Sequence, residues 1–206
     1  MSTPDAGRGR LIVLAGPSGV GKSAIVAALR TRLPQLHFSV SATTRAPRTG
    51  EVEGRDYHFV GDAGFDRMIA SGELLEWAEI HGGLQRSGTP RAPVEQALAG
   101  GYPVLVEVDL AGARAVKREL PESISVFVEP PSLAELERRL RERGTESPEQ
   151  FTRRLHTARE ELAARDEFDV ALVNDDIGAV ADRLVELLVH PVRKHPVHQH
   201  CQEFSL

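Results

Sequence analysis

Short apolar runs recur along the chain and predict buried strands. They occupy residues 11–15, 103–108, 124–128 and 169–173, with a shorter one at 37–40. A continuous apolar run, without a polar residue at every second position, is typical of a strand covered on both faces of a parallel sheet. The first run is followed by apolar residues at helical spacing, from Ile25 to Leu33, and Pro34 ends that helix.

Helix signals also accompany the later strands. The predicted helices cover residues 94–99, 132–144, 148 onward and about 176–189. Ser132 stands three residues before Glu135, which is the pattern of a capping box. Ser147 followed by Pro148 repeats the start signal, since serine favours the cap and proline the first turn. Strands that alternate with helices predict a three-layer α/β fold with a parallel central sheet.

Residues 41–90 break this alternation. Glycine and proline mark 41–56 as a loop, and the β-forming residues at 56–60 and 74–80 predict strands. A short helix that stops at Gly72 lies between those strands, and a hairpin-like stretch bounded by glycines follows them. The segment is therefore expected to form a small mixed β-rich insertion.

The two ends of the chain are expected to be flexible around one folded domain. The predicted domain is 10–189, with its core at 10–40 and 91–189 and the insertion at 41–90. Residues 1–9 are small and polar, and residues 190–206 contain charges and prolines at a chain end. The tail also holds His190, His195, His198, His200 and Cys201. Their ligand types would allow a metal site, but the terminal position favours a solvated tail.

Composition and charge narrow the classes of partner. The 206 residues suffice for one good core, and 41% hydrophobic content is ordinary for a globular protein. The formal charge of −5 argues against binding a nucleic acid polymer, which calls for a basic surface. The chain shows no apolar run of the roughly eighteen residues that a membrane span needs, and no secretory leader. Together with the single cysteine, this favours a cytoplasmic protein.

A phosphate-binding loop follows the first strand. Residues 16–23 match the pattern G-x-x-x-x-G-K-[ST], being Gly16, Pro17, Ser18, Gly19, Val20, Gly21, Lys22 and Ser23. The glycines allow a tight concave turn whose N–H groups converge on one anion. Lys22 can reach the outer phosphates, and the Ser23 hydroxyl is placed to ligate Mg²⁺. Strand, glycine loop and helix occur in the order that this chemistry requires, so the sequence predicts a nucleoside triphosphate site.

Arginines on the insertion suggest a second phosphate site. Arg45 and Arg48 lie three residues apart on the loop, and Tyr57 follows them. Guanidinium groups bind phosphate bidentately, so this set suits capture of a phosphate. Taken alone, these residues are better explained as a charged, solvated loop.

Acidic residues embedded in apolar strands form a second candidate group. Glu76, Glu107 and Asp109 lie within or at the end of predicted strands, where a carboxylate is costly without a partner. In a nucleotide site the partners would be the N–H donors of a guanine or a Mg²⁺ ion. For Glu76, simple exposure on the polar face of an edge strand is nearly as good an explanation.

Six arginines surround a glycine and suggest a lid over transferring phosphates. They are Arg138, Arg139, Arg141, Arg143, Arg153 and Arg154, on either side of Gly144. Arg139 and Arg143 are one helical turn apart and share a face. Most charges on a solvated helix are structural, so one or two of the six are the functional candidates.

Taken together, these motifs resemble the guanylate kinases over roughly residues 9–189. The resemblance rests on the phosphate loop and on Phe-Ser-Val-Ser-Ala-Thr-Thr-Arg-Ala-Pro-Arg-Thr-Gly-Glu at 38–51. It also uses Gly-Arg-Asp-Tyr at 54–57, Leu-Glu-Trp-Ala at 75–78, Glu107-Val108-Asp109 with Gly112, residues 138–146 and Val-Asn-Asp-Asp at 173–176. Several unrelated spacings are met in order, which makes the resemblance specific.

The resemblance implies a role for each matching residue. For GMP it implies base contacts from Ser41, Glu76, Thr89 and Asp109, and phosphate contacts from Arg45, Arg48 and Tyr57. For ATP it implies the loop at 16–23, Arg139, Arg143 and, beside the adenine, Asn174. It implies catalytic roles for Lys22, Arg45, Arg139, Arg143 and Arg154, the last three on a lid at about 138–154. Mg²⁺ would be bound by Ser23, with Glu107 and Asp109 acting through water.

The chain departs from the family pattern in two places. The family usually has a Tyr-Tyr-Gly-[ST] run, where this chain has Leu-Gln-Arg-Ser-Gly-Thr at 84–89. A tyrosine contact to the GMP phosphate is therefore missing, and either Ser87 or Arg86 stands in its place. The usual Asp-x-Asp is Glu107-Val108-Asp109, which keeps both charges but lengthens one side chain.

The predicted activity is direct in-line transfer of the γ-phosphoryl group of ATP to GMP or dGMP. Two alternatives stay open: a catalytically inactive, guanylate kinase-like scaffolding domain and a kinase for another nucleotide or small hydroxyl substrate. The intact Gly21, Lys22 and Ser23 oppose the scaffold, and the acidic residues favour guanine. The sequence leaves the oligomeric state open between a monomer and a weak dimer.

Overall fold

A five-stranded parallel sheet forms the centre of the molecule. The computed structural model describes residues 7–80, 84–142 and 148–189. The central strands are β1 (Leu11–Ala15), β2 (His37–Phe38), β7 (Val104–Glu107), β8 (Ile124–Glu129) and β9 (Val170–Val173). Their order in the sheet is β2-β7-β1-β8-β9. The apolar runs thus correctly predicted these strands. The middle strand is β1, which pairs in parallel with β7 on one side and with β8 on the other.

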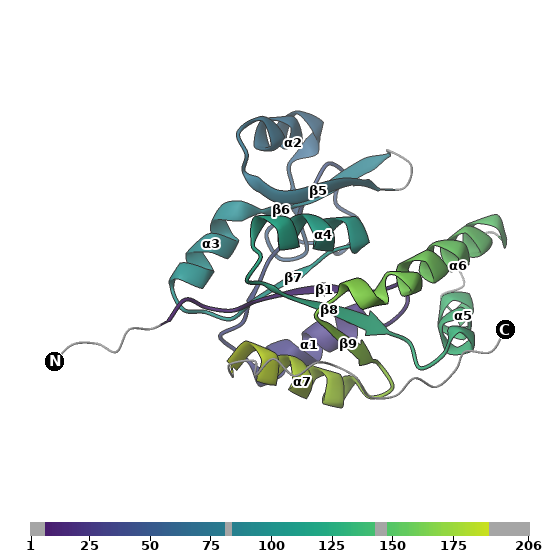
Figure 1. Ribbon diagram of the computed structural model, residues 1–206. Coiled ribbons are helices and arrows are strands. Elements are labelled where there is room, and N and C mark those ends of the chain that lie inside the picture. Colours follow the sequence, from purple (N-terminus) through teal and green to yellow (C-terminus); the bar gives the residue numbers. More distant parts are fainter. Residues whose placement is uncertain (1–6, 81–83, 143–147, 190–206) are drawn as a thin grey trace.

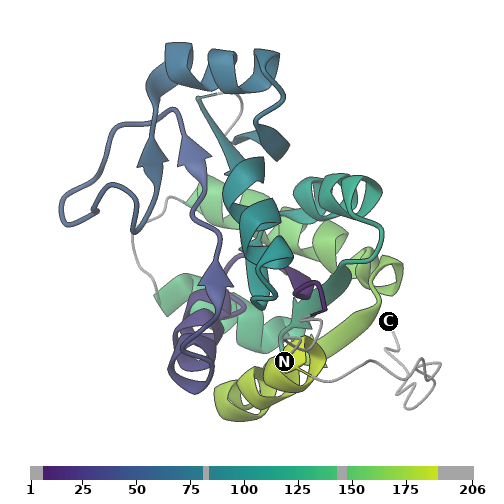
Figure 2. The same cartoon turned by 90° about the vertical axis from the view of Figure 1, so that its left-hand side faces the viewer.

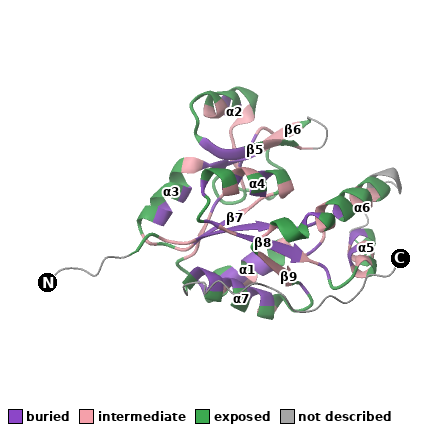
Figure 3. Ribbon diagram, viewed as in Figure 1, coloured by how far each residue is buried: buried purple, intermediate pink, exposed green. Residues whose placement is uncertain are grey.

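Helices cover both faces of this sheet and give the expected three layers (Figures 1 and 2). On one face lie α1 (Lys22–Arg32) and α7 (Ile177–Val189), and on the other α3 (Arg91–Ala99) and α4 (Leu110–Glu119). The side chains of β1 alternate between the two cores, with Ile12 and Leu14 facing α1 and Val13 facing α3 and α4. Burial on both faces is visible along the sheet in Figure 3. This explains the continuous apolar runs.

The insertion forms a second, four-stranded mixed sheet. It consists of β4 (His58–Phe59), β3 (Ala42–Thr43), β6 (Gln85–Pro90) and β5 (Leu74–Ile80), in that order, with α2 (Gly61–Ala70) packed against it. Ala42, Phe65 and Leu74 make its small core. The sheet sits over α4, which contacts β5 (Figure 1). The prediction of an unbroken loop at 41–56 is wrong, because β3 pairs with β6 there.

Helices α5 (Leu133–Glu142) and α6 (Pro148–Ala163) lie at the carboxyl ends of the central strands, and a short 3-10 helix, η1 (Arg165–Glu167), follows α6. Only half of the predicted capping box is present. The Glu135 N–H donates to the Ser132 hydroxyl at 3.1 Å, but the Glu135 carboxylate binds arginines instead of the Ser132 N–H. Of the N-terminal residues expected to be flexible, 1–9, residues 1–6 lie outside the described part of the chain. The tail at 190–206 and the glycines at 82–83 and 144 also lie outside it.

Candidate active site

The loop at 16–23 lies at the centre of the sheet's carboxyl edge. It follows the middle strand β1, and α1 begins within it at Lys22. Gly16 has φ +148°, and a Cβ at this position would stand 2.3 Å from the Val128 carbonyl oxygen on the neighbouring strand. A side chain is therefore excluded at Gly16. Gly21 caps the helix at φ +103°, and α1 begins with its N-terminus at the loop, where the helix dipole favours an anion.

Three carbonyl groups of the loop accept hydrogen bonds from side chains. The Lys22 ammonium donates to the Gly16 carbonyl at 2.7 Å and lies 3.4 Å from that of Pro17. The Val20 carbonyl accepts from Asn174 Nδ2 at 2.7 Å and from Arg139 Nη1 at 3.2 Å. The loop is thus held by Asn174, which follows β9, by Arg139 of α5 and by its own Lys22.

A cavity of about 510 Å³ extends from this loop to the insertion sheet. Its floor includes Gly16, Ser18, Lys22, Ser23, Glu107 and Asp109, and its opposite wall includes Ser41, Tyr57, Glu76, Ala78, Ile80 and Ser87. Glu76, Ala78 and Ile80 share one face of β5, as the alternation in the sequence predicts. One cavity is therefore lined both by the phosphate-binding loop and by Glu76 and Asp109, which the resemblance predicts to contact the base.

Glu76 and Asp109 approach each other at the top of α4. A Cβ on Gly112 would lie 2.9 Å from Val108 Cβ, 3.0 Å from Glu76 Oε2 and 3.3 Å from Asp109 Oδ1, so glycine at this position lets both carboxylates pack closely against the start of α4. Asp109 caps α4 by accepting the Gly112 N–H at 2.7 Å. The Thr89 hydroxyl lies 2.6 Å from Glu76 Oε1. Glu76 is 8% exposed, and this burial, with Asp109 adding repulsion, raises its pKa to about 7.

Comparison with known proteins decides the family. The family model described as guanylate kinase matches residues 8–190. The guanylate kinase of Nocardia farcinica is 64% identical over 182 residues, which are 88% of this chain and 94% of that protein. That of Corynebacterium efficiens is 55% identical over 90% of this chain and 97% of its own length. The crystal structure of guanylate kinase from Anaplasma phagocytophilum aligns with a TM-score of 0.70 at 33% identity, covering 88% of this chain and 85% of that one.

The chain belongs to the guanylate kinase family. It is accordingly a nucleoside monophosphate kinase, and both the resemblance and the α/β fold expected from the sequence are confirmed. The family alone does not assign roles to individual residues, so these are considered from the geometry of this chain.

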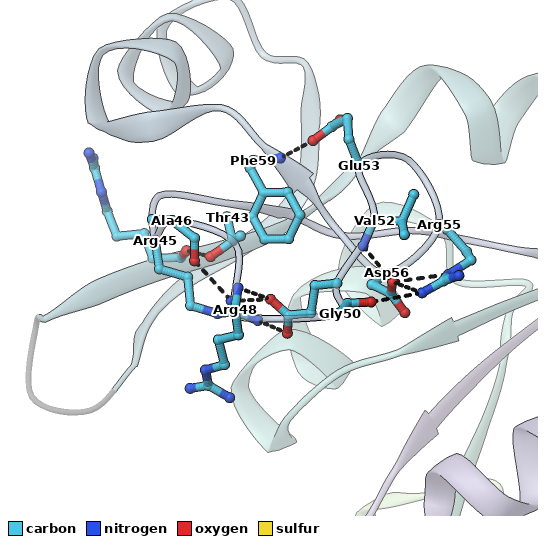
Figure 4. Close-up of polar contacts among 12 residues, drawn as sticks. Thr43, Arg45, Ala46, Arg48, Gly50, Val52, Glu53, Arg55, Asp56 and Phe59 are labelled. Atoms are coloured by element: carbon cyan, nitrogen blue, oxygen red, sulfur yellow. Dashed lines mark hydrogen bonds and ion pairs between the residues drawn. The ribbon is translucent and has the colours of Figure 1, made fainter.

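Glu51 occupies one side of the Arg45 guanidinium. Both Arg45 Nη atoms donate to the Glu51 carboxylate at 2.6 Å, and the guanidinium carbon lies 4.7 Å from the centre of the Tyr57 ring. Glu51 also accepts the main-chain N–H of Arg48 at 2.7 Å (Figure 4). The ion pair lowers the pKa of Glu51 to about 2. Sequence reasoning missed Glu51 as a site residue, because the spacing of a loop carries no periodic signal.

Arg48, Ser87 and Arg86 are the other candidates for the GMP phosphate on the insertion, and their contacts differ. The Arg48 guanidinium extends away from these contacts (Figure 4), and no hydrogen bond or ion pair holds it among the described residues. Of the two residues that could replace the absent tyrosine, Ser87 lines the cavity. Arg86 instead pairs with Asp62 and Asp66 on α2, on the other face of β6. The structure thus brings Ser87, and not Arg86, to the cavity.

The arginines of the predicted lid separate into surface pairs and one residue at the loop. Arg138 binds Glu135 and Glu142, and Arg141 binds Glu137, so both exposed arginines pair with carboxylates of α5 itself. Arg139 binds Glu135 but also reaches Val20. Arg154 lies half-buried on α6, and Arg143 lies outside the described residues. Arg138 and Arg141 are therefore engaged in pairs within α5, whereas Arg139 also contacts the phosphate loop.

Glu161, near the end of α6, is a cavity residue that sequence reasoning missed. It lines the cavity together with Lys22, Glu107 and Asp109. Burial raises the pKa values of Glu161 and Glu107, while the charge of Lys22 opposes the shift for both. In sequence, Glu161 is one charge among many on an amphipathic helix, so only the fold separates it from its neighbours.

Within the described ranges, no helix is long and apolar enough to cross a membrane.

Proposed function

We propose that this chain transfers the γ-phosphoryl group of ATP to GMP in one in-line step, giving ADP and GDP. A single observation carries the proposal: one cavity has Lys22 and Ser23 on its floor and the buried Glu76 on its opposite wall. The membership in the guanylate kinase family supports the same reaction. The triphosphate would lie on the loop, and the acceptor nucleotide would lie under the insertion sheet.

Guanine selection is assigned to Glu76 and Asp109. Guanine presents N1–H and an amino group on one edge, and two carboxylates that accept from them complete their hydrogen bonding. Adenine lacks the N1–H donor and would leave a buried carboxylate unpaired, which costs more than a missing bond in water. Thr89 holds Glu76 in place. Ser41 lines the same wall and would contact the base or its neighbourhood.

The phosphate of GMP would be bound by Arg48, Arg45 and Tyr57. Arg48 has its guanidinium available, whereas Arg45 is oriented by Glu51 and by the Tyr57 ring. An anion beside Arg45 would meet a guanidinium whose position is already fixed, which reduces the entropy lost on binding. Ser87 offers a shorter hydroxyl in place of the phenol that the family pattern has at this position.

The residues at the loop fit a Mg²⁺ ion. The Ser23 hydroxyl and the carboxylates of Glu107 and Asp109 are hard oxygen ligands, the type that Mg²⁺ prefers. Among the described residues, no three acidic, histidine or cysteine side chains converge closely enough to hold a metal by themselves. This fits an ion bound mainly by phosphate oxygens and water, with Ser23 as a direct ligand. When bound, Mg²⁺ would neutralise charge on the transferring phosphates.

Catalysis would come from positioning and charge. Lys22 would move from the Gly16 carbonyl to the phosphates, and Arg139, Arg143 and Arg154 would approach from the lid. No general base is needed, because the attacking phosphate of GMP is already anionic. Closure of the insertion and the lid would exclude water and so prevent ATP hydrolysis.

A panel of acceptors tests the proposed reaction. ADP release from MgATP is expected with GMP and, to an extent that the structure leaves open, with dGMP, but not with AMP, CMP or UMP. Absence of ADP release with every acceptor would support the scaffold alternative instead. A preference for AMP or a pyrimidine nucleotide would show that the acidic pair does not select guanine.

The raised pKa of Glu76 predicts that GMP binding depends on pH. The proton on Glu76 replaces an acceptor by a donor, so GMP affinity should weaken as the pH falls below about 7. Guanine donors stabilise the charged carboxylate, so bound GMP should lower the pKa of Glu76 and binding should release a proton. Carbon NMR of the Glu76 carboxyl measures this directly and is independent of the phosphate titration of GMP. A carboxyl that titrates near 4.5 in the free protein would contradict it.

A further inference from the structure

The Val20 carbonyl of the phosphate loop is held by two side chains from distant parts of the chain. Asn174, which follows β9, donates its Nδ2 hydrogen at 2.7 Å, and Arg139 of α5 donates at 3.2 Å. A carbonyl oxygen only accepts, so the amide must present its NH₂ group to Val20. The acceptor therefore fixes the orientation of the Asn174 side chain.

Asn174 is a buried structural contact of the loop rather than a surface residue. It is 2% exposed, and its main-chain N–H donates to the Glu129 carbonyl at 2.8 Å, which continues the pairing of β8 and β9. It does not line the cavity. A Cβ at Gly21 would stand 2.6 Å from Asn174 Nδ2, so the amide packs directly under the turn that presents the phosphate-binding N–H groups.

The two donors on Val20 differ in what they can do when a triphosphate arrives. Arg139 is a long cation on the lid side, and the proposed function moves it onto the ATP phosphates. Asn174 is short, neutral and anchored in the sheet through its backbone, so it stays. We propose that Asn174 is a positioning residue that holds the Val20 carbonyl and so keeps the phosphate loop in its anion-binding shape. The resemblance places it beside the adenine, whereas the geometry assigns its effect to the phosphates.

The test compares a ligand that contains adenine with one that does not. Asn174→Leu keeps the branched outline of the side chain with somewhat larger end groups, removes the donor and also removes Oδ1, which is buried without a partner. The affinities of the full-length wild-type and variant chains for MgATP and for magnesium tripolyphosphate are measured by calorimetry. We expect both to weaken by about tenfold, the effect of losing one hydrogen bond to a buried carbonyl. GMP affinity should remain within twofold of the wild-type value.

A selective loss would overturn the proposal. If Asn174→Leu weakens MgATP but leaves tripolyphosphate unchanged, the residue acts on adenine, and if neither changes, the amide does not position the loop. Asn174→Ala carries the same comparison should the leucine variant not fold, and Asp175→Ala, an exposed neighbour, is the control. The inference rests on the proposed ATP site but not on the acceptor. Failure of the acceptor panel would therefore reject the proposed reaction while leaving the tripolyphosphate comparison to decide the role of Asn174.

Discussion

Replacing Lys22 by alanine should lower kcat for GDP formation by about a hundredfold to a thousandfold. The Lys22 ammonium lines the cavity floor, and in this state it donates a hydrogen bond to the Gly16 carbonyl at 2.7 Å. In the proposed reaction it leaves that carbonyl and meets charge that grows between the two nucleotides in the transition state. Interactions that strengthen in the transition state raise kcat, so the loss should appear mainly in kcat and less in KM for GMP.

Two measurements separate this loss from damage to the fold. Thermal unfolding and GMP affinity of Lys22→Ala should stay close to wild type, because the GMP wall belongs to the insertion sheet and lies across the cavity. Arg183→Ala is a suitable control, since Arg183 is a half-exposed cation on α7 that pairs with Glu186. Turnover of Lys22→Ala near the wild-type rate would remove Lys22 from the proposed mechanism.

The parts of the fold that the sequence predicted are those with a repeated local signal. The strand at 11–15 is buried on both faces, so each of its residues is apolar and the run is visible without any partner. The phosphate loop is equally local, because its N–H groups, lysine and serine come from consecutive residues. By contrast, β3 is only two residues long, too short for any periodicity, and exists through its pairing with β4 and β6 within the insertion. Helix α4 was not predicted as such, although Gly112 and Asp109 at its start were recognised as a motif.

The candidate site was predicted as a set of residues but not as a set of contacts. Glu76 and Asp109 stand out in sequence because they interrupt apolar strands, yet their approach over Gly112 depends on the insertion sheet lying on α4. Glu51 gives no such signal, and it changes the picture of Arg45 from a free guanidinium to one already paired. Glu161 reaches the cavity only because α6 runs back over the edge of the central sheet. Partners that are distant in sequence, or set by loop geometry, leave no pattern along the chain.

Replacing Glu76 by glutamine should reduce kcat/KM for GMP on the order of 10³-fold. The amide has nearly the shape of the carboxyl group and can keep the contact with Thr89, whose hydroxyl lies 2.6 Å from Glu76 Oε1. Its NH₂ group, however, faces the donors of guanine, so one hydrogen bond becomes a clash of donors in a buried place. The penalty of an unpaired buried group is larger than that of a bond lost in water.

The control for this variant lies on the same strand. Glu79→Gln makes the identical chemical change at an exposed position of β5 and should leave kcat/KM for GMP unchanged. Glu76→Gln should also abolish the pH step near 7 in GMP binding, because that step belongs to the Glu76 carboxyl. A variant that loses affinity but keeps the step would place the titrating group elsewhere. One that binds GMP as tightly as wild type would show that the buried acid does not read the guanine, and the assignment of base selection would pass to Asp109 and Ser41.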